Sequence, residues 1–150
     1  MTVPAFLDHD DPDHPGWRRF PPSDPTRFNT LLGTMRYRID GAVARVRMIP
    51  EHRHSNLRDH VHGGALLGFI DVSLFAATRG LGLITAGTAV TLDLNTQFIG
   101  GATIGAAIEA QVEVLKETGR LIFLRGLVVQ GDDAARIAAF SATIRKPAKG

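Results

Sequence analysis

The stretch from His60 to Gly80 constrains the fold of this chain more than any other part of the sequence. A Gly63-Gly64 pair opens a predicted helix that is apolar on almost every face, and one carboxylate, Asp71, stands in its middle. A helix that is apolar all round packs inside a protein. An unpaired carboxylate buried there destabilises the fold unless it takes up a proton. We therefore expect this helix to be the central element and Asp71 to serve the function.

The length and composition are those of one globular domain. The chain has 150 residues, 44% of them apolar and 21% charged, and no apolar tract is long enough to cross a bilayer. The absence of cysteine excludes disulfides and cysteine metal sites. The net charge is only +2 and the basic residues are dispersed, so nucleic acid and membranes are not expected partners. The chain does not open on a secretory signal, which favours a cytoplasmic location.

The first 25 residues differ from the rest in composition. Residues 1–25 are rich in proline and acids and poor in aliphatic residues, which is typical of an extended arm. The aromatic residues expected to anchor this arm are Phe6, Trp17 and Phe20. Residues 26–150 form the predicted domain.

Alternation of apolar and polar residues predicts an antiparallel sheet. A tight turn at Asp40-Gly41 joins the first two strands, and a short helix over 24–33, with Asp24 as its N-cap, precedes them. The predicted strands cover 34–40, 42–49, 88–99, 104–116, 120–130 and 134–145. The run over 120–130 is almost continuously apolar, so we expect both of its faces to be covered. These elements predict an α+β fold in which the sheet wraps around the central helix.

The glycine pair and Asp71 together suggest a site for a developing oxyanion and a base. Backbone N–H groups at a helix start suit an oxyanion, although Gly63 and Gly64 could serve close packing instead. Burial would make the Asp71 carboxylate more basic and so suit it to act as a general base. The alternative is that this carboxylate accepts hydrogen bonds from buried backbone amides. Asn56 could orient a carbonyl or a water, but most loop asparagines shape turns.

Three other polar groups are weaker candidates. Four histidines between 52 and 62 form an HxH…HxH pattern that could bind zinc or iron, but no acid joins them, so we expect no metal and assign His62 to fixing the glycine turn. A basic ribbon on the first hairpin is typical of a solvated face; it consists of Arg36, Arg38, Arg45 and Arg47. Lys116 and Arg120 flank a turn and are candidates for phosphate contact.

These motifs together resemble the signature of hotdog-fold acyl-CoA thioesterases of the phenylacetate-degradation (PaaI) type. The resemblance rests on Asn56, the triplet His62-Gly63-Gly64 and Asp71, at the spacing of that family. It covers about residues 29–146 and leaves the arm outside. This branch also includes relatives that act on 4-hydroxybenzoyl-CoA and 1,4-dihydroxy-2-naphthoyl-CoA.

The resemblance implies a mechanism without a metal or other cofactor. Asp71 would activate water or attack the thioester carbonyl, and the N–H of Gly63, alone or with that of Gly64, would polarise the carbonyl. Asn56 would orient the water or the thioester, and Thr91 matches a position where relatives carry a hydroxyl that assists the water. Sites of this family lie between two subunits, which implies a homodimer, and such dimers can pair into a homotetramer.

The resemblance also implies where an aryl or a short- to medium-chain acyl-CoA would bind. The acyl group would enter an apolar tunnel near Leu67 and Phe75, and the CoA phosphates would lie near Lys116 or Arg120. Phe75 stands where some relatives have threonine, a departure that concerns substrate choice. Two alternatives remain open: a non-catalytic acyl-CoA-binding module, and an enoyl-thioester hydratase or dehydratase that would use His62.

Overall fold

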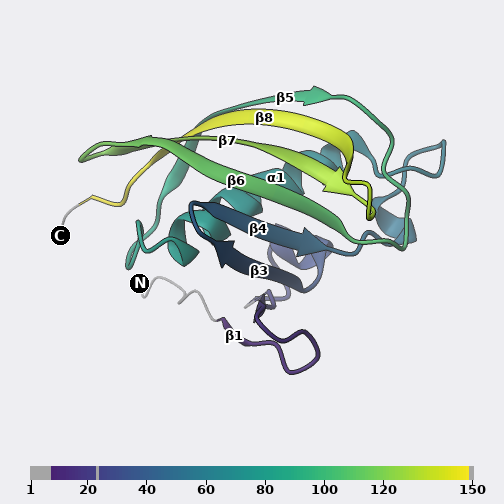
Figure 1. The fold of residues 1–150 in the computed structure, drawn as a ribbon, viewed down its shortest axis with the longest axis horizontal. Helices are drawn as coiled ribbons and strands as arrows, with labels where there is room; N and C mark the ends of the chain where they lie inside the picture. Colours follow the sequence, from purple (N-terminus) through teal and green to yellow (C-terminus); the bar gives the residue numbers. More distant parts are fainter. Residues whose placement is uncertain (1–7, 23, 149–150) are drawn as a thin grey trace.

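The computed structural model describes residues 8–22 and 24–148, so Phe6 lies outside the described residues. The strands are β1 (His9–Asp10), β2 (Arg18–Phe20), β3 (Met35–Asp40), β4 (Val43–Met48), β5 (Val90–Phe98), β6 (Ile108–Glu117), β7 (Leu121–Gln130) and β8 (Ala135–Arg145). They form one antiparallel sheet in the order β1-β2-β3-β4-β6-β7-β8-β5. The long helix α1 (Gly63–Gly80) lies beneath the curved strands (Figure 1). The predicted α+β architecture is confirmed.

The central helix is buried mainly along the face that meets the sheet. Phe69, Ile70 and Leu74 on that face have no exposed surface, and they pack with inward side chains of the strands in one apolar core. Burial of such large side chains stabilises the fold by about 1.5–3 kcal/mol each. Among the described residues, no helix is both long enough and apolar enough to cross a membrane.

The first hairpin has the predicted form. Gly41 takes a positive φ of 60° in the turn between β3 and β4, a conformation that glycine adopts without steric cost. Val46 and Met48 point into the core, and the intervening arginines face outward because side chains alternate along a strand.

The arm adds two short strands to this end of the sheet. β2 pairs with β3, and β1 pairs with β2. Trp17 and Phe20 are buried, as expected for anchors. The carboxylate of Asp11 is buried as well, and it accepts a hydrogen bond from Arg36 on β3. The arm therefore covers backbone groups of β3 that would otherwise form an open sheet edge.

The expected helix over 24–33 is wrong in type and in start. The structure has a 3-10 helix, η1 (Phe28–Leu32), whose N-cap is Arg27. Asp24 does not cap it because its carboxylate accepts hydrogen bonds from the backbone and side chain of Thr26, at 2.9 and 2.6 Å, and shapes a preceding turn. Gly33 ends η1 with φ of 73°, at the predicted position.

Two strand predictions also need correction. The run over 120–130 is not covered on both faces: residues of β7 alternate, with Ile122 and Leu124 buried and Phe123 and Leu127 only half-buried on the outer face. The second correction concerns β6, which begins at Ile108 rather than at 104, because Gly105 has a φ of 91° that breaks the extended backbone.

Candidate active site

The first turn of α1 leaves the backbone N–H of Gly63 without a partner among the described residues. His62 is the N-cap, and its Nδ1 accepts a 2.8 Å hydrogen bond from the Gly64 N–H. The predicted role of His62 in fixing the turn is therefore confirmed. The Gly64 N–H, which the resemblance allowed as a second donor to the carbonyl, is occupied by the His62 ring. The Gly63 N–H has no partner within residues 8–22 and 24–148, and a free N–H at a helix start is the kind of donor that suits an oxyanion.

His54 holds the glycine turn against the rest of the molecule. It belongs to the 3-10 helix η2 (His52–His54) and is buried. Its Nδ1 accepts from the Glu51 N–H at 2.9 Å, and its Nε2 contacts the Leu31 carbonyl oxygen. Its own carbonyl accepts a 2.7 Å hydrogen bond from the His62 N–H.

In the described part of the chain, no three His, Cys, Asp or Glu side chains are grouped to hold a metal ion.

Asn56 shapes the loop that leads to the turn. Its Oδ1 accepts hydrogen bonds from the backbone N–H groups of Arg58, at 2.8 Å, and His60, at 3.2 Å. This is the turn-forming role that the sequence left open as an alternative. The side-chain amide nitrogen has no partner among the described residues, so Asn56 can hold the loop and still donate to a water or a thioester.

Asp71 lies on the open side of α1. The carboxylate is half-buried rather than fully enclosed, and its Oδ1 accepts a 2.7 Å hydrogen bond from the Thr91 hydroxyl on β5. Neighbours on this stripe of the helix are Leu67, which is exposed, and Phe75, which is half-buried. Leu74 and Thr78, one and two helical turns further on, are fully buried. The sheet leaves this stripe uncovered, which explains how a charge is tolerated on so apolar a helix.

The oxyanion donor and the carboxylate cannot act on one carbonyl from within one chain. Gly63 and Asp71 are eight residues apart on the same helix, which separates them by about 12 Å along its axis. A base and an oxyanion donor each act within about 3 Å of the reacting group. Within one chain, the Gly63 N–H and the Asp71 carboxylate are therefore too far apart to act on the same carbonyl.

A comparison with protein families shows the family of this chain. The family model described as the thioesterase superfamily matches residues 59–137, which is more than half of the chain and includes the glycine turn and Asp71. The chain belongs to the thioesterase superfamily. It is a thioester hydrolase, as the sequence led us to expect. No curated protein matches it.

Solved structures of similar fold support this assignment. The TT0310 protein from Thermus thermophilus is 25% identical, with a TM-score of 0.66 over 82% of this chain and 97% of that chain. A mutant of the phenylacetic acid degradation protein PaaI from the same organism is 24% identical, with a TM-score of 0.66 over 82% and 99%. Thioesterase superfamily member 2 from Mus musculus is 22% identical, with a TM-score of 0.66 over 79% and 86%. The expected hotdog fold is confirmed.

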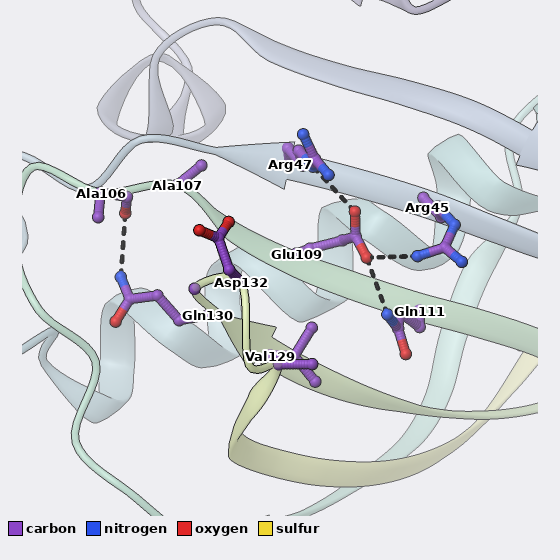
Figure 2. Close-up of a pocket in the computed structure, with 11 residues that line it drawn as sticks. Arg45, Arg47, Ala106, Ala107, Glu109, Gln111, Val129, Gln130 and Asp132 are labelled. Carbon is purple, nitrogen blue, oxygen red and sulfur yellow. Dashed lines mark hydrogen bonds and ion pairs between the residues drawn. The ribbon is translucent and has the colours of Figure 1, made fainter.

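The basic ribbon of this thioesterase is not a free cationic surface. The buried Glu109 on β6 accepts hydrogen bonds from Arg45, at 2.9 Å, and Arg47, at 2.8 Å (Figure 2). Burial would raise the pKa of Glu109, but hydrogen bonds from Gln111 and Arg47 outweigh it and lower that pKa. The guanidinium groups of Arg38 and Arg47 also stack on Trp17, 5.0 and 4.3 Å from the ring centre. The expected solvated face is therefore ion-paired, and the arm covers part of it with Trp17.

A second group of basic side chains lines a pocket that the sequence did not predict. Its volume is about 810 Å³, and Arg120, Arg145 and Lys146 line it together with Val90. Val90 pairs with Arg145 and directly precedes Thr91, the partner of Asp71. Of the two residues that the sequence offered for phosphate contact, Arg120 lines this pocket, whereas Lys116 is exposed and does not line it. Arg145 and Lys146 come from the end of β8, so only the sheet pairing could reveal their approach to Arg120.

Proposed function

We propose that this chain hydrolyses acyl-CoA to a free acid and CoA, at sites that two copies of the chain form together. The observation that carries the proposal is the division of the site into a free Gly63 N–H and, two helical turns on, a carboxylate held by Thr91. Two antiparallel copies would bring each Gly63 near the Asp71 of the other copy. Each site would then contain one oxyanion donor and one base.

The reaction assigns one task to each side chain. Asp71 takes a proton from a water, whose oxygen bonds to the thioester carbonyl carbon while the Gly63 N–H stabilises the oxyanion. Collapse of the tetrahedral intermediate breaks the carbon–sulfur bond, and the CoA thiolate leaves and takes up a proton. Direct attack by Asp71 on the carbonyl, followed by hydrolysis of the anhydride, uses the same groups. Thr91 positions the carboxylate, and the Asn56 amide donates to the water or the thioester.

The edge strand β5 is the surface that we assign to the second copy. It ends the sheet beside β8, and its side chains Val90, Leu92 and Phe98 are 42%, 51% and 57% exposed. An unpaired edge with exposed apolar residues is a template for pairing with another strand. The Phe98 ring lies against Gly63, 3.5 Å from where a Cβ would stand, so pairing at β5 would form next to both half-sites.

The cationic pocket suits the phosphates of CoA. Lys146 is paired with Glu117 at 2.7 Å, whereas Arg120 and Arg145 are exposed and make no ion pair with any described residue. Guanidinium groups bind phosphate oxygens in a bidentate manner. The pocket begins one residue from Thr91, and the pantetheine arm would extend from there to the carboxylate.

The two alternative functions have less support. A hydratase would need His62 as an acid or base, but its Nδ1 already accepts from Gly64. A non-catalytic binding module would not need a carboxylate that is held in place by a hydroxyl on the open face of the helix.

Thiol release from a panel of aryl, short-chain and medium-chain acyl-CoAs tests the proposal. The unmodified protein should release CoA, and Asp71→Asn should reduce kcat by about 10²–10⁴-fold, the range for loss of a general base. Asp132→Asn, an exposed acid in the turn between β7 and β8, is the control. Equal turnover by Asp71→Asn would overturn the mechanism. Tight binding without CoA release would favour the binding module, and loss of enoyl absorbance from an enoyl-CoA would favour the hydratase.

A further inference from the structure

One buried titratable side chain beside the glycine turn has no part in the proposed reaction. His54 in η2 is 5% exposed, and its ring makes two hydrogen bonds to backbone groups. Nδ1 accepts from the Glu51 N–H at 2.9 Å, so Nδ1 carries no proton. The proton must then lie on Nε2, because the partner of Nε2 is the Leu31 carbonyl oxygen, which can only accept. The ring of His54 is therefore neutral, and its tautomer is fixed.

We propose that His54 is a positioning residue for the reaction: through its ring and its backbone carbonyl, it sets the direction in which the Gly63 N–H points. The inference rests on the proposed function, since it concerns the oxyanion donor of the same site. His54 does not touch the substrate and acts only through the glycine turn.

The Gly63 N–H belongs to the peptide group that joins His62 to Gly63. A trans peptide group is planar, and its N–H points opposite to its carbonyl. The carbonyl of this group accepts a 3.0 Å hydrogen bond from the Leu66 N–H, which directs the carbonyl along α1. The Gly63 N–H consequently points out of the start of the helix. Its direction changes only if the backbone of His62 turns.

His54 restrains the backbone of His62. The backbone carbonyl of His54 accepts a 2.7 Å hydrogen bond from the His62 N–H, on the side of His62 that precedes the donor peptide. On the following side, the ring of His62 accepts from the Gly64 N–H at 2.8 Å. The φ of His62, −60°, and its ψ, 137°, are thus held from both sides.

The His54 carbonyl can serve as an anchor because the ring of the same residue is tied to the core. Leu31, whose carbonyl accepts from the ring, immediately precedes Leu32 in η1, and Leu32 is buried in the apolar core. The ring thus connects η2 to a fixed segment, and the carbonyl connects η2 to the glycine turn. Catalytic groups need such supports, since an error of about 1 Å in position can cost about 10²-fold in rate.

The two hydrogen bonds of the ring can be separated from its bulk by substitution. Glutamine can replace both functions of the neutral ring, because its Oε1 accepts and its Nε2 donates. His54 is the third residue of a capping box that begins at Glu51, and glutamine is a usual residue at that position. Leucine fills the buried space but can neither accept nor donate.

Kinetics of His54→Leu and His54→Gln test the inference on the acyl-CoA that the unmodified protein hydrolyses fastest. His54→Leu should lower kcat by about 10- to 100-fold with little change in KM, because the oxyanion forms only in the transition state. His54→Gln should restore most of kcat. His52→Leu is the matched control and should leave kcat unchanged, because His52 is exposed in the same short helix and its ring bonds to no described residue.

A CoA thioether, in which a methylene replaces the carbonyl, should bind the unmodified protein and the three variants equally, because it has no oxygen for the Gly63 N–H. Weaker binding of the thioether by His54→Leu would show that His54 only supports the fold. Equal loss of kcat in His54→Leu and His54→Gln would show the same.

Long-range proton–nitrogen NMR spectra give a measurement that does not depend on turnover. They distinguish the tautomers of histidine, and His54 should be neutral with its proton on Nε2. A ring protonated at Nδ1 would overturn the inference. If the unmodified protein hydrolyses no acyl-CoA, the proposed function fails and the role of His54 fails with it. Hydrolysis by the unmodified protein with an equal kcat for His54→Leu overturns the role of His54 alone.

Discussion

The hydroxyl of Thr91 donates a 2.7 Å hydrogen bond to Oδ1 of Asp71, from the edge strand to the middle of the helix. A register shift in the pairing of β5 with β8 lies between Thr91 and Asp93, and such bulges re-aim individual side chains next to active sites. Asp71 Oδ2 has no partner among the described residues. One oxygen of the carboxylate is thus held in place, and the other is available to accept a proton from water.

Thr91→Val should lower kcat about 10- to 100-fold with little change in KM, because a hydrogen bond to a charged group contributes about 1.5–3 kcal/mol. Thr91→Ser keeps the hydroxyl and should restore most of the activity. Thr143→Val, on the neighbouring strand β8, is the matched control. If Thr91→Val and Thr91→Ser lose activity equally, the methyl group matters and the hydroxyl does not. Thiol release under saturating substrate gives kcat for all three variants.

The CoA assignment predicts a loss that depends on the phosphates of the substrate. Arg145→Ala and Arg120→Ala should each raise KM for an acyl-CoA several-fold and leave kcat/KM for the matching acyl-pantetheine unchanged, since that substrate has no nucleotide. Raising the salt concentration should weaken binding of the unmodified protein in the same selective way. Arg125→Ala is the control, because Arg125 is paired with Glu113 on the outer face. Equal effects on both substrates would exclude the pocket as a phosphate site.

Most of the fold could be predicted from local patterns. Alternating residues and the Asp40-Gly41 turn specify the first hairpin, because a period of two dominates that segment. The length of the apolar stretch between the glycine pair and Gly80 indicates α1. The type of η1 could not be predicted in this way. Asp24 is a residue type that often caps a helix, but its carboxylate accepts hydrogen bonds from Thr26 in a turn instead. A helix cap and such a turn use the same residue types and differ only in backbone conformation.

The contacts within the candidate site could not be predicted from the sequence. The spacing of Asn56, Gly63 and Asp71 indicated the chemistry, yet the bond from Gly64 to His62 depends on the rotamer of one side chain. The approach of Arg145 to Arg120 depends on strand pairing across β7 and β8. Contacts of this kind join distant segments, and no periodicity in the chain reports them.

The buried carboxylate of Asp11 predicts a defined loss of stability in acid. Burial alone would raise its pKa, but hydrogen bonds from Arg36 and from the Asp13 N–H, with the charge of Arg19, lower that pKa to about 2. A lowered folded-state pKa stabilises the protein above pH 3.8, and this contribution is lost as the pH falls towards 2. Asp11→Asn should therefore be less stable than the unmodified protein at pH 7, and the difference should shrink between pH 4 and 2.

Urea midpoints across that pH range measure the difference. Asp10→Asn is the control, because Asp10 forms an ion pair with Arg18 at 2.8 Å but its side chain is 92% exposed. Exposed pairs contribute little to stability, so this variant should follow the unmodified protein at every pH. A constant offset between Asp11→Asn and the unmodified protein from pH 7 to 2 would mean that ionisation of Asp11 does not stabilise the fold.

Gly126 in the middle of β7 is the position where a single methyl group should be most costly. In most strands an alanine would be preferred to glycine, but here a Cβ would stand 2.2 Å from the backbone oxygen of Gln111 and 2.5 Å from the ring of Phe140. The oxygen belongs to the neighbouring strand β6 and cannot move without disturbing the pairing. Gly126→Ala should therefore lower the free energy of unfolding by about 1–3 kcal/mol or more, the cost of overpacking a core.

Gly119→Ala is the matched comparison for this prediction. A Cβ at Gly119 would meet nothing within 4 Å, so the same substitution should change the free energy of unfolding by less than about 0.5 kcal/mol. Urea denaturation followed by circular dichroism compares the two variants directly. Equal stability of Gly126→Ala and Gly119→Ala would contradict the close approach of β6, β7 and Phe140. A selective loss at Gly126 would show that the sheet is packed around this glycine.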